Sequence, residues 1–452
     1  MNIALFLTVF SALTIFYFFI GLHAAKNIKT NTDFFLASRD LGLFPVMFTL
    51  IATQLGGGML LGTAQESYSI GLWGVLYTLG MSLGFLMLGL GFAAKLRSLN
   101  VATTAELFQT KYNSPTLKKV ASLLSIATMC GLLIAQVIAS RALLNGLQIN
   151  NEAIFLMFWT LIIIYTMVGG LKAVVVTDVA QVWVIILVFS SIFIYSLFGE
   201  PASFFSLPSF AAMQDGFSLG NVTPSALLAT IMLPALFSLI EQDLAQRFFA
   251  ARTQRIAALA AIGSSIFLLI FSLVPIYFGM KARMLNLDIM PGASPLIPVI
   301  EILTNEYVLI FAVCGIIAAI TSTADSLLCA VSSNVAQDFD FSFLGIKNQL
   351  RVSQLVTLIT GIIALIASYL VSQNIISLLI ASYEISVSCL LVPLLFAYFG
   401  KNLKKNAAIG AIIGGLAGFI IFRFYPIVLP KEIAALLVSL IGYYVGRSIK
   451  QY

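Results

Sequence analysis

The sequence predicts an all-α integral membrane protein with about thirteen transmembrane helices. Of its 452 residues, 60% are hydrophobic and only 9% are charged. So few charges cannot cover the water-facing surfaces of the roughly three soluble domains that this length would otherwise suggest. The charges lie in short clusters between apolar runs of about 20 residues, the length that a helix needs to cross a bilayer.

The apolar runs fix the expected order of the helices. The first run lacks the basic start of a signal peptide and is long enough to span, so it is expected to be retained. Most of the 24 lysines and arginines fall on one side if the N-terminus lies outside and the C-terminus inside, as cytoplasmic loops require. The candidate spans are residues 3–24, 43–64, 71–96, 117–147, 153–168, 171–198, 224–250, 255–281, 306–335, 350–372, 375–398, 405–424 and 431–448.

Several function classes lack their usual residues. Cys130, Cys314, Cys329 and Cys389 all lie inside apolar runs without metal-ligand spacing, and His23 is the single histidine. Zinc sites and histidine-based catalysis are therefore not expected, and the protein is not expected to be an enzyme. The net charge of +6 reflects topology and contact with anionic lipid headgroups, so no nucleic-acid partner is expected.

Two spans are interrupted internally, and they occupy matching positions in the chain. The second span contains Gly56, Gly57 and Gly58 in succession, which disfavours a continuous helix. The seventh contains Pro234, which lacks a backbone donor, and then Glu241. Close helix packing or a simple kink would explain either feature alone. Their matched positions favour two inverted five-helix repeats with a substrate and ion site at mid-membrane.

The repeats define the expected organisation of one transmembrane domain over residues 1–452. An extra helix at 3–24 precedes a first five-helix repeat at 43–198. The second, inverted repeat covers 224–398, and two C-terminal helices follow at 405–448.

Two carboxylates lie inside spans, where a charge is costly unless it is paired or functional. Asp178 lies at the start of the sixth span and Asp325 lies well inside the ninth. Ser322, Asp325 and Ser326 share one helix face, with Thr323 beside them. A hydroxyl that bonds back to a carbonyl four residues earlier would explain any one of these residues. Together with an unwound span, the cluster favours a site for a hard cation such as sodium.

Three segments resemble the sodium/solute symporter family, which includes the sodium/glucose cotransporters and the proline, pantothenate, sialic acid and choline carriers. YTMVGGLKAVVVTDVAQ (165–181) is similar to the family signature, AAITSTADSLL (318–328) to its sodium-site helix, and IATQLGGGMLLGT (51–63) to its unwound first core helix. The similarity extends over most of the chain. It implies the LeuT-type fold, with ten core helices, one extra helix before them and two after.

The resemblance also implies sodium-binding residues, position by position. The principal sodium site corresponds to the carbonyls of Ala52, Leu55 and Ala319 and the hydroxyls of Ser322 and Thr323. A second sodium, which some members bind, would lie at Asp178, Asp325 and Ser326. One or two sodium ions and no organic cofactor are therefore expected.

The substrate contacts are expected from the unwound segments and the facing fourth span. The candidate residues offer amides, one guanidinium and one carboxylate, and this set suits a small zwitterion or a hydroxylated organic acid. The motifs look most similar to those of choline carriers, which cage a quaternary ammonium between aromatic rings, but no set of three aromatic residues is apparent. The candidates are Gln54, Gly56, Gly57, Met81, Gln136, Arg141, Glu241 and Gln242.

Two of the charged positions have competing interpretations. Arg141 could hold a substrate carboxylate by two parallel bonds, or could extend to the membrane surface or pair with an acid such as Glu66. Glu241 could contact substrate or, with Asp243, belong to an inner gate, since Arg247 is one helical turn from Asp243 and could pair with it.

The expected function is sodium-driven symport of a small organic solute (an amino acid, a carboxylate or a choline-like molecule) into the cell by alternating access. Coupling to protons is an alternative because Asp178 and Asp325 could titrate; a membrane solute sensor or a channel is less favoured. The protein is expected to span the cell membrane many times, the inner membrane if the source is bacterial. It is expected to work as a monomer in contact with lipid.

Overall fold

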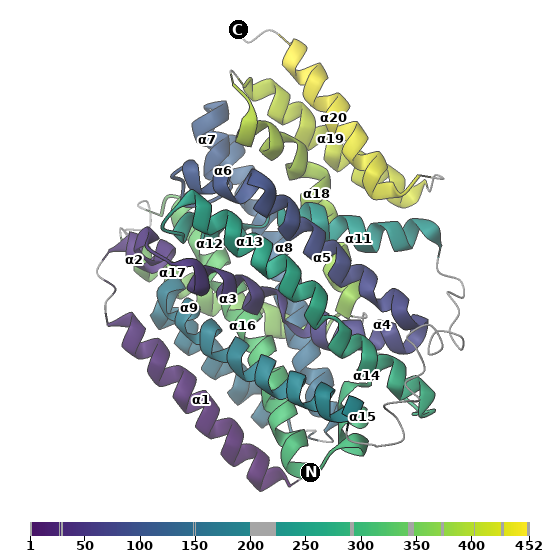
Figure 1. Cartoon of the computed structure of the whole chain (residues 1–452). Helices are drawn as coiled ribbons and strands as arrows, with labels where there is room; N and C mark the ends of the chain where they lie inside the picture. The colour runs from purple at the N-terminus through teal and green to yellow at the C-terminus, as the bar shows by residue number, and fades with distance from the viewer. Residues whose placement is uncertain are drawn as a thin grey trace.

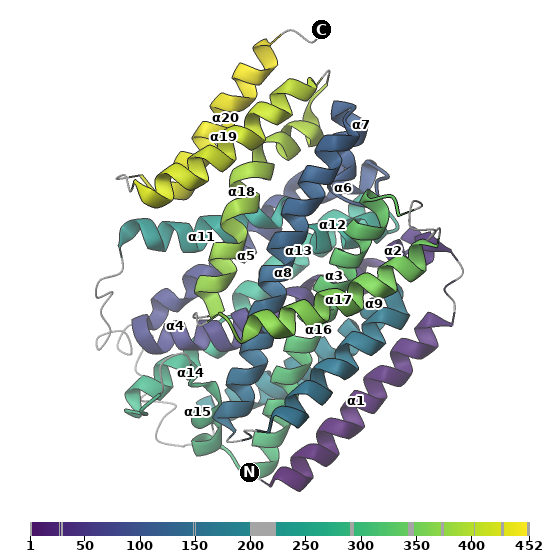
Figure 2. The ribbon, with the colours of Figure 1, turned by 180° about the vertical axis from the view of Figure 1, so that it is seen from behind.

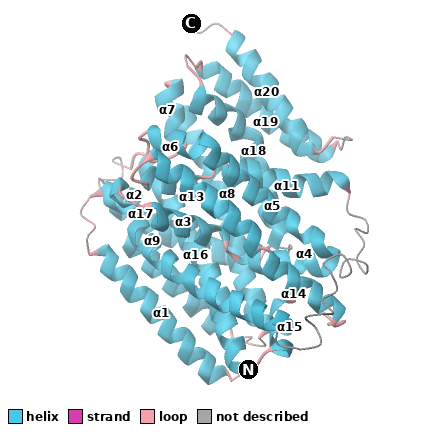
Figure 3. Cartoon of the chain, viewed as in Figure 1, coloured by secondary structure: helices cyan, strands magenta, loops and turns pink. Residues whose placement is uncertain are grey.

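The computed structural model describes most of the chain, namely residues 2–26, 28, 30–147, 149, 151–198, 223–289, 293–341, 348–371, 375–401, 403–425 and 429–449. These residues are organised almost entirely as helices (Figure 3). No β-strand occurs within the described ranges, where Leu41 and Ala251 form an isolated parallel bridge.

The first half of the chain runs from the N-terminal helix to a long bent helix. Its elements are α1 (Ile3–Ala25), α2 (Asn31–Leu36), η1 (Ala37–Arg39), α3 (Leu43–Gln54), η2 (Gly58–Gly62), α4 (Thr63–Ile70), η3 (Gly71–Gly74), α5 (Val75–Met87), η4 (Leu88–Phe92), α6 (Ala93–Ser98), α7 (Glu106–Tyr112), α8 (Pro115–Gly146) and α9 (Glu152–Phe198).

The second half begins after the segment 199–222 and ends near the C-terminus. Its elements are α11 (Pro224–Ser238), α12 (Gln242–Ala250), α13 (Gln254–Phe271), α14 (Leu273–Met284), α15 (Leu296–Leu303), α16 (Glu306–Asp338), α17 (Gln349–Ser368), α18 (Ile375–Phe399), α19 (Lys405–Phe424) and α20 (Lys431–Ser448).

The helical stretches have the length and composition of membrane spans. Ten stretches of the described residues are long and apolar enough to cross a bilayer, and the shorter α3 is also apolar. Many of their large side chains, including Leu90, Ile270 and Leu370, are exposed on the outside of the bundle. Apolar side chains can face outward in this way because lipid replaces water as the solvent. The count of thirteen crossings and the orientation of the termini stay predictions.

The bundle is built around α16. This helix is buried along most of its length and packs against α8, α9, α17 and α3. Figure 1 shows α1 along one outer edge, against α9, while α19 and α20 form a pair at the opposite end, against α18. The reverse view shows the same arrangement, with α17 crossing the face between α1 and α18 (Figure 2). An oxygen-rich helix is therefore held in the interior by apolar neighbours.

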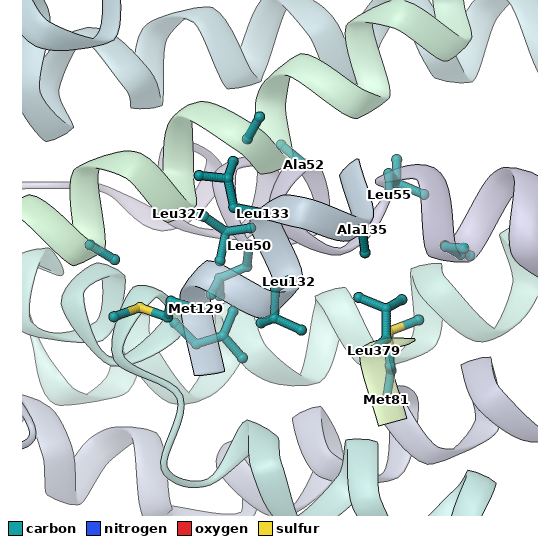
Figure 4. Packing of buried hydrophobic residues seen from close by; sticks show 14 of the residues in the cluster. Leu50, Ala52, Leu55, Met81, Met129, Leu132, Leu133, Ala135, Leu327 and Leu379 are labelled. Atoms are coloured by element: carbon teal, nitrogen blue, oxygen red, sulfur yellow. The ribbon is translucent and has the colours of Figure 1, made fainter. Parts of the chain in front are cut away.

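The first predicted interruption is confirmed. Helix α3 ends at Gln54, and the chain resumes as a π-helical turn at Gly58. The interruption lies deep inside the protein, among buried apolar residues of α3, α8 and α16 such as Leu55, Leu132 and Leu327 (Figure 4). Carbonyls near the end of α3 therefore need hydrogen-bond partners from other helices.

The second interruption lies later than the proline suggests. Pro234 is inside α11, which continues to Ser238; the break occurs at residues 239–241, where Glu241 adopts an extended conformation with φ −62° and ψ 126°. The Ser238 hydroxyl donates to the Pro234 carbonyl at 2.8 Å. The proline is therefore accommodated within the helix, and the separation of α11 from α12 follows one turn later.

The expected gap between the fifth and sixth spans, at residues 169–170, takes a different form. Both spans belong to α9, which bends at Gly170, where φ is +53° and ψ is −167°. A Cβ atom at Gly170 would lie 2.6 Å from the Phe34 ring and 2.7 Å from the Phe34 carbonyl oxygen. Only glycine combines this backbone conformation with so close an approach to α2.

Gly170→Ala tests this bend. We expect the substitution to lower the free energy of unfolding by about 2–4 kcal/mol, because it adds backbone strain to overpacking against Phe34. Thermal unfolding in detergent measures the effect. Gly146→Ala is the matched control, since the nearest atom to its Cβ would lie 3.8 Å away. Equal melting temperatures for the two variants would contradict the inference that only glycine fits at position 170.

Candidate ion and solute site

Hydroxyls of α16 bind the carbonyls that α3 leaves free. Ser322 Oγ donates to the Ala52 carbonyl at 3.1 Å and to the Ala319 carbonyl at 3.0 Å. Thr323 Oγ1 lies 3.0 Å from the Thr53 carbonyl, 3.2 Å from that of Ala319 and 3.4 Å from that of Ala52. The structure thus gathers Ala52, Ala319, Ser322 and Thr323 at one point between two helices.

Leu55, the remaining residue of the predicted first sodium site, is fully buried at the end of α3. Its backbone N–H donates to the Ile51 carbonyl at 2.9 Å, closing the last turn of the helix. Leu55 therefore lies at the interruption, next to the oxygen cluster.

The glycines of the interruption allow close approach to two other helices. A Cβ at Gly56 would lie 2.5 Å from Thr323 Oγ1, and one at Gly57 would lie 2.4 Å from the Ala139 Cβ. The Gly57 N–H donates to Gln136 Oε1 on α8 at 2.8 Å. The interrupted segment is therefore held between α16 and α8, and larger residues would push these helices apart.

A small cavity adjoins the interruption. Four predicted substrate residues, Gln54, Gly56, Gln136 and Glu241, line it, and Gly57 is bonded to one of them. The full lining is Thr53, Gln54, Gly56, Gly58, Met59, Tyr77, Leu132, Gln136, Glu241, Asp243, Thr323, Leu327, Leu379 and Tyr383. None of these side chains is basic.

The cavity also has an aromatic side that the sequence did not reveal. The hydroxyls of Tyr77 on α5 and Tyr383 on α18 lie 3.0 Å apart, and the Phe237 ring stacks on Tyr383 with centroids 4.5 Å apart. Tyr77 and Tyr383 are 306 positions apart in the chain, so no local pattern could connect them. Asp243 was considered only as a gate residue, yet it lines the same cavity.

Besides Gly57, three predicted substrate residues lie outside the cavity lining. Met81 is buried with the apolar core (Figure 4). Gln242 Oε1 accepts hydrogen bonds from the Thr104 N–H at 2.7 Å and the Thr104 hydroxyl at 3.1 Å. Arg141 is the third, and it lies among aromatic side chains.

Arg141 is held by aromatic rings near the end of α8. Its guanidinium lies 3.8 Å from the Tyr369 ring centroid and 4.5 Å from that of Phe155, and 3.9 Å from Glu152 Oε2. It is five residues beyond Gln136, or about 7.5 Å along a helix axis. The acid beside Arg141 is therefore Glu152.

The predicted second sodium site contains a residue that the sequence reasoning placed elsewhere. The fully buried Arg247 guanidinium donates from Nη2 to Asp178 Oδ2 at 3.4 Å and to the Ser326 hydroxyl. Its Nε donates to Thr49 Oγ1 at 2.9 Å, and the Thr49 hydroxyl in turn donates to Asp178 Oδ2. A positive charge from α12 therefore lies between two of the three predicted ligands.

This pairing differs from the expected inner-gate pair. Arg247 contacts the backbone carbonyl of Asp243 at 2.8 Å, while the carboxylate it pairs with is that of Asp178. Asp325, the third predicted ligand, is fully buried and accepts a hydrogen bond from the Tyr165 hydroxyl at 2.6 Å. The signature segment and the sodium-site helix are thereby joined through Arg247 and through Tyr165, and Gln181 Nε2 also donates to Thr321 Oγ1 at 3.0 Å.

Comparison with known proteins identifies the family. The model of the sodium:solute symporter family matches residues 34–418. The chain belongs to the sodium:solute symporter family. This symporter-family chain is 26% identical to high affinity choline transporter 1 of Mus musculus, over 90% of this chain and 75% of the transporter. It is 25% identical to the sodium/pantothenate symporter of Escherichia coli, over 96% and 95% of the two chains.

Matches to some other choline transporters are shorter. Identity to high-affinity choline transporter 1 of Torpedo marmorata is 32%, over 39% of this chain and 32% of the transporter. The chain spans about a third to a half of the length of the Torpedo, Caenorhabditis elegans and Drosophila melanogaster transporters that it matches.

Solved structures of low sequence identity establish the fold. The TM-score is 0.82 to a substrate-bound, outward-open sodium-coupled sialic acid symporter, with 18% identity over 99% of this chain and 98% of that one. It is 0.59 to a closed nucleobase-cation-symport-1 family transporter, with 14% identity over 94% and 97%. This family member therefore has the LeuT-type fold. Its relatives are transporters and not enzymes, and it is a multi-pass protein of the cell membrane.

Removal of Arg247 tests the buried ion pair. We expect Arg247→Gln to lower the free energy of unfolding by about 3–5 kcal/mol, because it leaves the Asp178 carboxylate buried without a counter-charge. The exposed pair of Arg252 and Asp40, with N and O 2.6 Å apart, provides the control. Arg252→Gln should cost under about 1 kcal/mol.

The double variant Arg247→Met/Asp178→Leu removes both buried charges. It should recover part of the stability lost in Arg247→Gln, and thermal unfolding in detergent measures all three. A double variant no more stable than Arg247→Gln would show that pairing with Asp178 is not what Arg247 contributes.

Proposed function

We propose that this protein is a sodium-coupled symporter for a small organic solute that carries an ammonium group. The observation that carries the proposal is the cavity beside the interrupted helix α3. Its lining contains the carboxyl groups of Glu241 and Asp243, the phenol rings of Tyr77 and Tyr383, and no basic side chain. Carboxylates attract a cationic group, and aromatic faces favour an organic ammonium through cation-π interaction.

The amides of the cavity add directional contacts for the rest of the solute. Gln54 and Gln136 both line it. The Gln136 oxygen is bound to the Gly57 N–H, which leaves the nitrogen of this amide as the group able to donate to a solute oxygen. Amino acids and choline-like molecules share an ammonium group with a nearby oxygen. Because Arg141 lies outside this lining, a solute recognised only by its carboxylate is less favoured.

Sodium coupling is supported by the oxygen cluster between α3 and α16. The proposed sodium ligands are the carbonyls of Ala52, Leu55 and Ala319 and the hydroxyls of Ser322 and Thr323. Sodium is a hard cation that prefers such oxygens. It would replace the hydrogen bonds that now join them, and Thr323, which also lines the cavity, would connect bound ion to bound solute.

A second sodium at Asp178, Asp325 and Ser326 would require movement of Arg247. The guanidinium already binds two of the three residues. We therefore propose that the first site is the one able to bind sodium in this arrangement of helices, and that the second binds sodium only when Arg247 has turned away. Alternating access would supply such rearrangements, since the two broken helices belong to segments expected to rock against the rest.

Coupling of transport to protons is the second candidate, and it is favoured by the surroundings of the Asp325 carboxyl. This carboxyl is fully buried, and one of its oxygens has no hydrogen-bond partner among the described residues. A buried carboxyl with one oxygen left without a donor is a candidate to hold a cation or a proton.

Reconstituted protein distinguishes the two coupling ions. We expect uptake of an ammonium-bearing solute such as choline, betaine, proline or another amino acid into proteoliposomes under an inward sodium gradient, and little uptake under an inward proton gradient alone. The driving force is about 2.3 kcal/mol per sodium for each 100 mV of membrane potential. Uptake driven equally well without sodium would establish proton coupling instead, and failure with every such solute would refute the proposed substrate class.

The first sodium site has its own test. Ser322→Ala and Thr323→Ala each remove one proposed ligand, so the sodium concentration needed for half-maximal thermal stabilisation should rise about tenfold, equivalent to about 1.4 kcal/mol. Thr357→Ala is the control, because its hydroxyl bonds only within α17, to the Ser353 carbonyl at 2.9 Å. If the Ser322, Thr323 and Thr357 variants all need a similar sodium concentration for half-maximal stabilisation, the proposed first sodium site is wrong.

A further inference from the structure

A basic pocket lies away from the solute cavity, where two membrane helices end. It is lined by Arg97, Ser98, Asn100, Arg252, Thr253, Gln254 and Arg255. Ser98 ends α6, and Gln254 begins α13. Nothing in the proposed transport cycle uses this pocket.

The pocket has an excess of positive charge. Arg252 pairs with Asp40, with N and O 2.6 Å apart, but both side chains remain more than half exposed, at 59% and 66%. No acidic residue lines the pocket. Beside it, burial and the positive charge of Arg97 lower the pKa of Arg39, against a smaller opposing effect of Glu106. Arginines are therefore crowded here beyond what neighbouring carboxylates neutralise.

Hydrogen bonds fix the shape of the pocket. Arg97 Nε donates to the Ala251 carbonyl, and Arg97 Nη1 donates to Asn100 Oδ1 at 3.2 Å. The Arg252 N–H donates to the Leu41 carbonyl at 2.9 Å, and Thr253 caps the start of α13. The arginines thus project from a backbone that is already ordered, and the N-terminal end of α13 adds its partial positive charge.

Exposed apolar side chains lie on the helical elements next to the pocket. Helix α13 packs against α6 and η4. On these elements Leu90 is 76% exposed and Leu259 is 43% exposed, and Met87 just before η4 is 42% exposed. A free phosphate would use only the arginines, whereas a phospholipid would use the arginines for its headgroup and this surface for its acyl chains.

We propose that the pocket of Arg97, Arg252 and Arg255 binds the phosphate headgroup of an anionic phospholipid, whose acyl chains lie on the exposed surface of α13 and η4. Basic pockets between membrane helices at the membrane surface are suited to such headgroups. The guanidinium groups bind phosphate oxygens through paired N–H donors. This site is independent of the transported solute and of the coupling ion.

The bound lipid would lie next to the machinery of the candidate site. The loop between α12 and α13 carries Arg252 and is tied to Leu41, just before α3, by two backbone hydrogen bonds at 2.9 and 3.1 Å. Arg247 of the buried ion pair is five residues from Arg252. A headgroup that bridges Arg97 with Arg252 and Arg255 would hold this loop against the end of α6.

Native mass spectrometry of the purified full-length protein tests the proposal, with phosphatidylglycerol, cardiolipin and phosphatidylcholine as probes. We expect the wild type to retain the two anionic lipids and not phosphatidylcholine. In Arg252→Gln/Arg255→Gln, affinity for the anionic lipids should fall roughly 25-fold, about fivefold for each arginine. Arg97 is left in place because it supports the loop.

The control is Lys111→Gln/Lys119→Gln, which removes two exposed positive charges elsewhere and should bind like the wild type. Soluble glycerophosphoglycerol should fail to displace the lipid, since it lacks acyl chains. If the double arginine variant does not fold, as judged by gel filtration, the exposed single variant Arg255→Gln should still show about a fivefold loss. Equal retention by the folded arginine variant and the wild type, or full displacement by the soluble headgroup, would overturn the lipid site.

Discussion

The structure depends on one constraint, which is that backbone polar groups exposed by a broken helix inside a membrane protein must find partners. Helix α3 stops at Gln54, and the carbonyls of Ala52 and Thr53 accept hydrogen bonds from Ser322 and Thr323. On the other side the Gly57 N–H is bound by Gln136. These contacts require α16 and α8 to approach the interruption closely, and glycine at positions 56 and 57 leaves the space for them.

The same constraint gives the site its chemistry. Groups that satisfy a broken helix are necessarily oxygens and amides, and these are also the groups that bind a hard cation and a polar solute. The proposed ion site therefore coincides with the hydrogen bonds that satisfy the free carbonyls at the end of α3. A site built in this way is sensitive to helix movement, since separation of α3 from α16 would disperse the ligands. This is the physical basis on which release of the ion can be linked to a change in helix arrangement.

The buried Arg247 supplies a second connection between the two halves of the chain. It joins Thr49 of α3, Asp178 of α9 and Ser326 of α16, all with one guanidinium. Such a charge is costly to bury and is retained only when paired, so the pair with Asp178 fixes the relative positions of three helices. Because Arg247 lies where a second cation was expected, a fixed charge and a mobile ion compete for the same carboxylate in the proposed cycle.

The sequence by itself determined the class of molecule and predicted residues that the structure brings together at the proposed first ion site. Hydropathy identified the membrane helices, because burial in lipid requires long apolar runs whatever their neighbours are. The glycine triplet and the i, i+3, i+4 oxygens of α16 are local patterns, so the interruption and the residues Ser322 and Thr323 could be found from the chain alone.

Tertiary structure decided the features that depend on distant contacts. Tyr77 and Tyr383 meet across the cavity from helices far apart in the chain, and Arg247 reaches Asp178 and not the nearby Asp243 carboxylate because α9 lies within range of its guanidinium. Helix periodicity could not decide whether Arg141 lines the cavity, since its surroundings depend on the positions of Phe155 and Tyr369. Local sequence specifies which residues a helix offers, and only packing specifies what they meet.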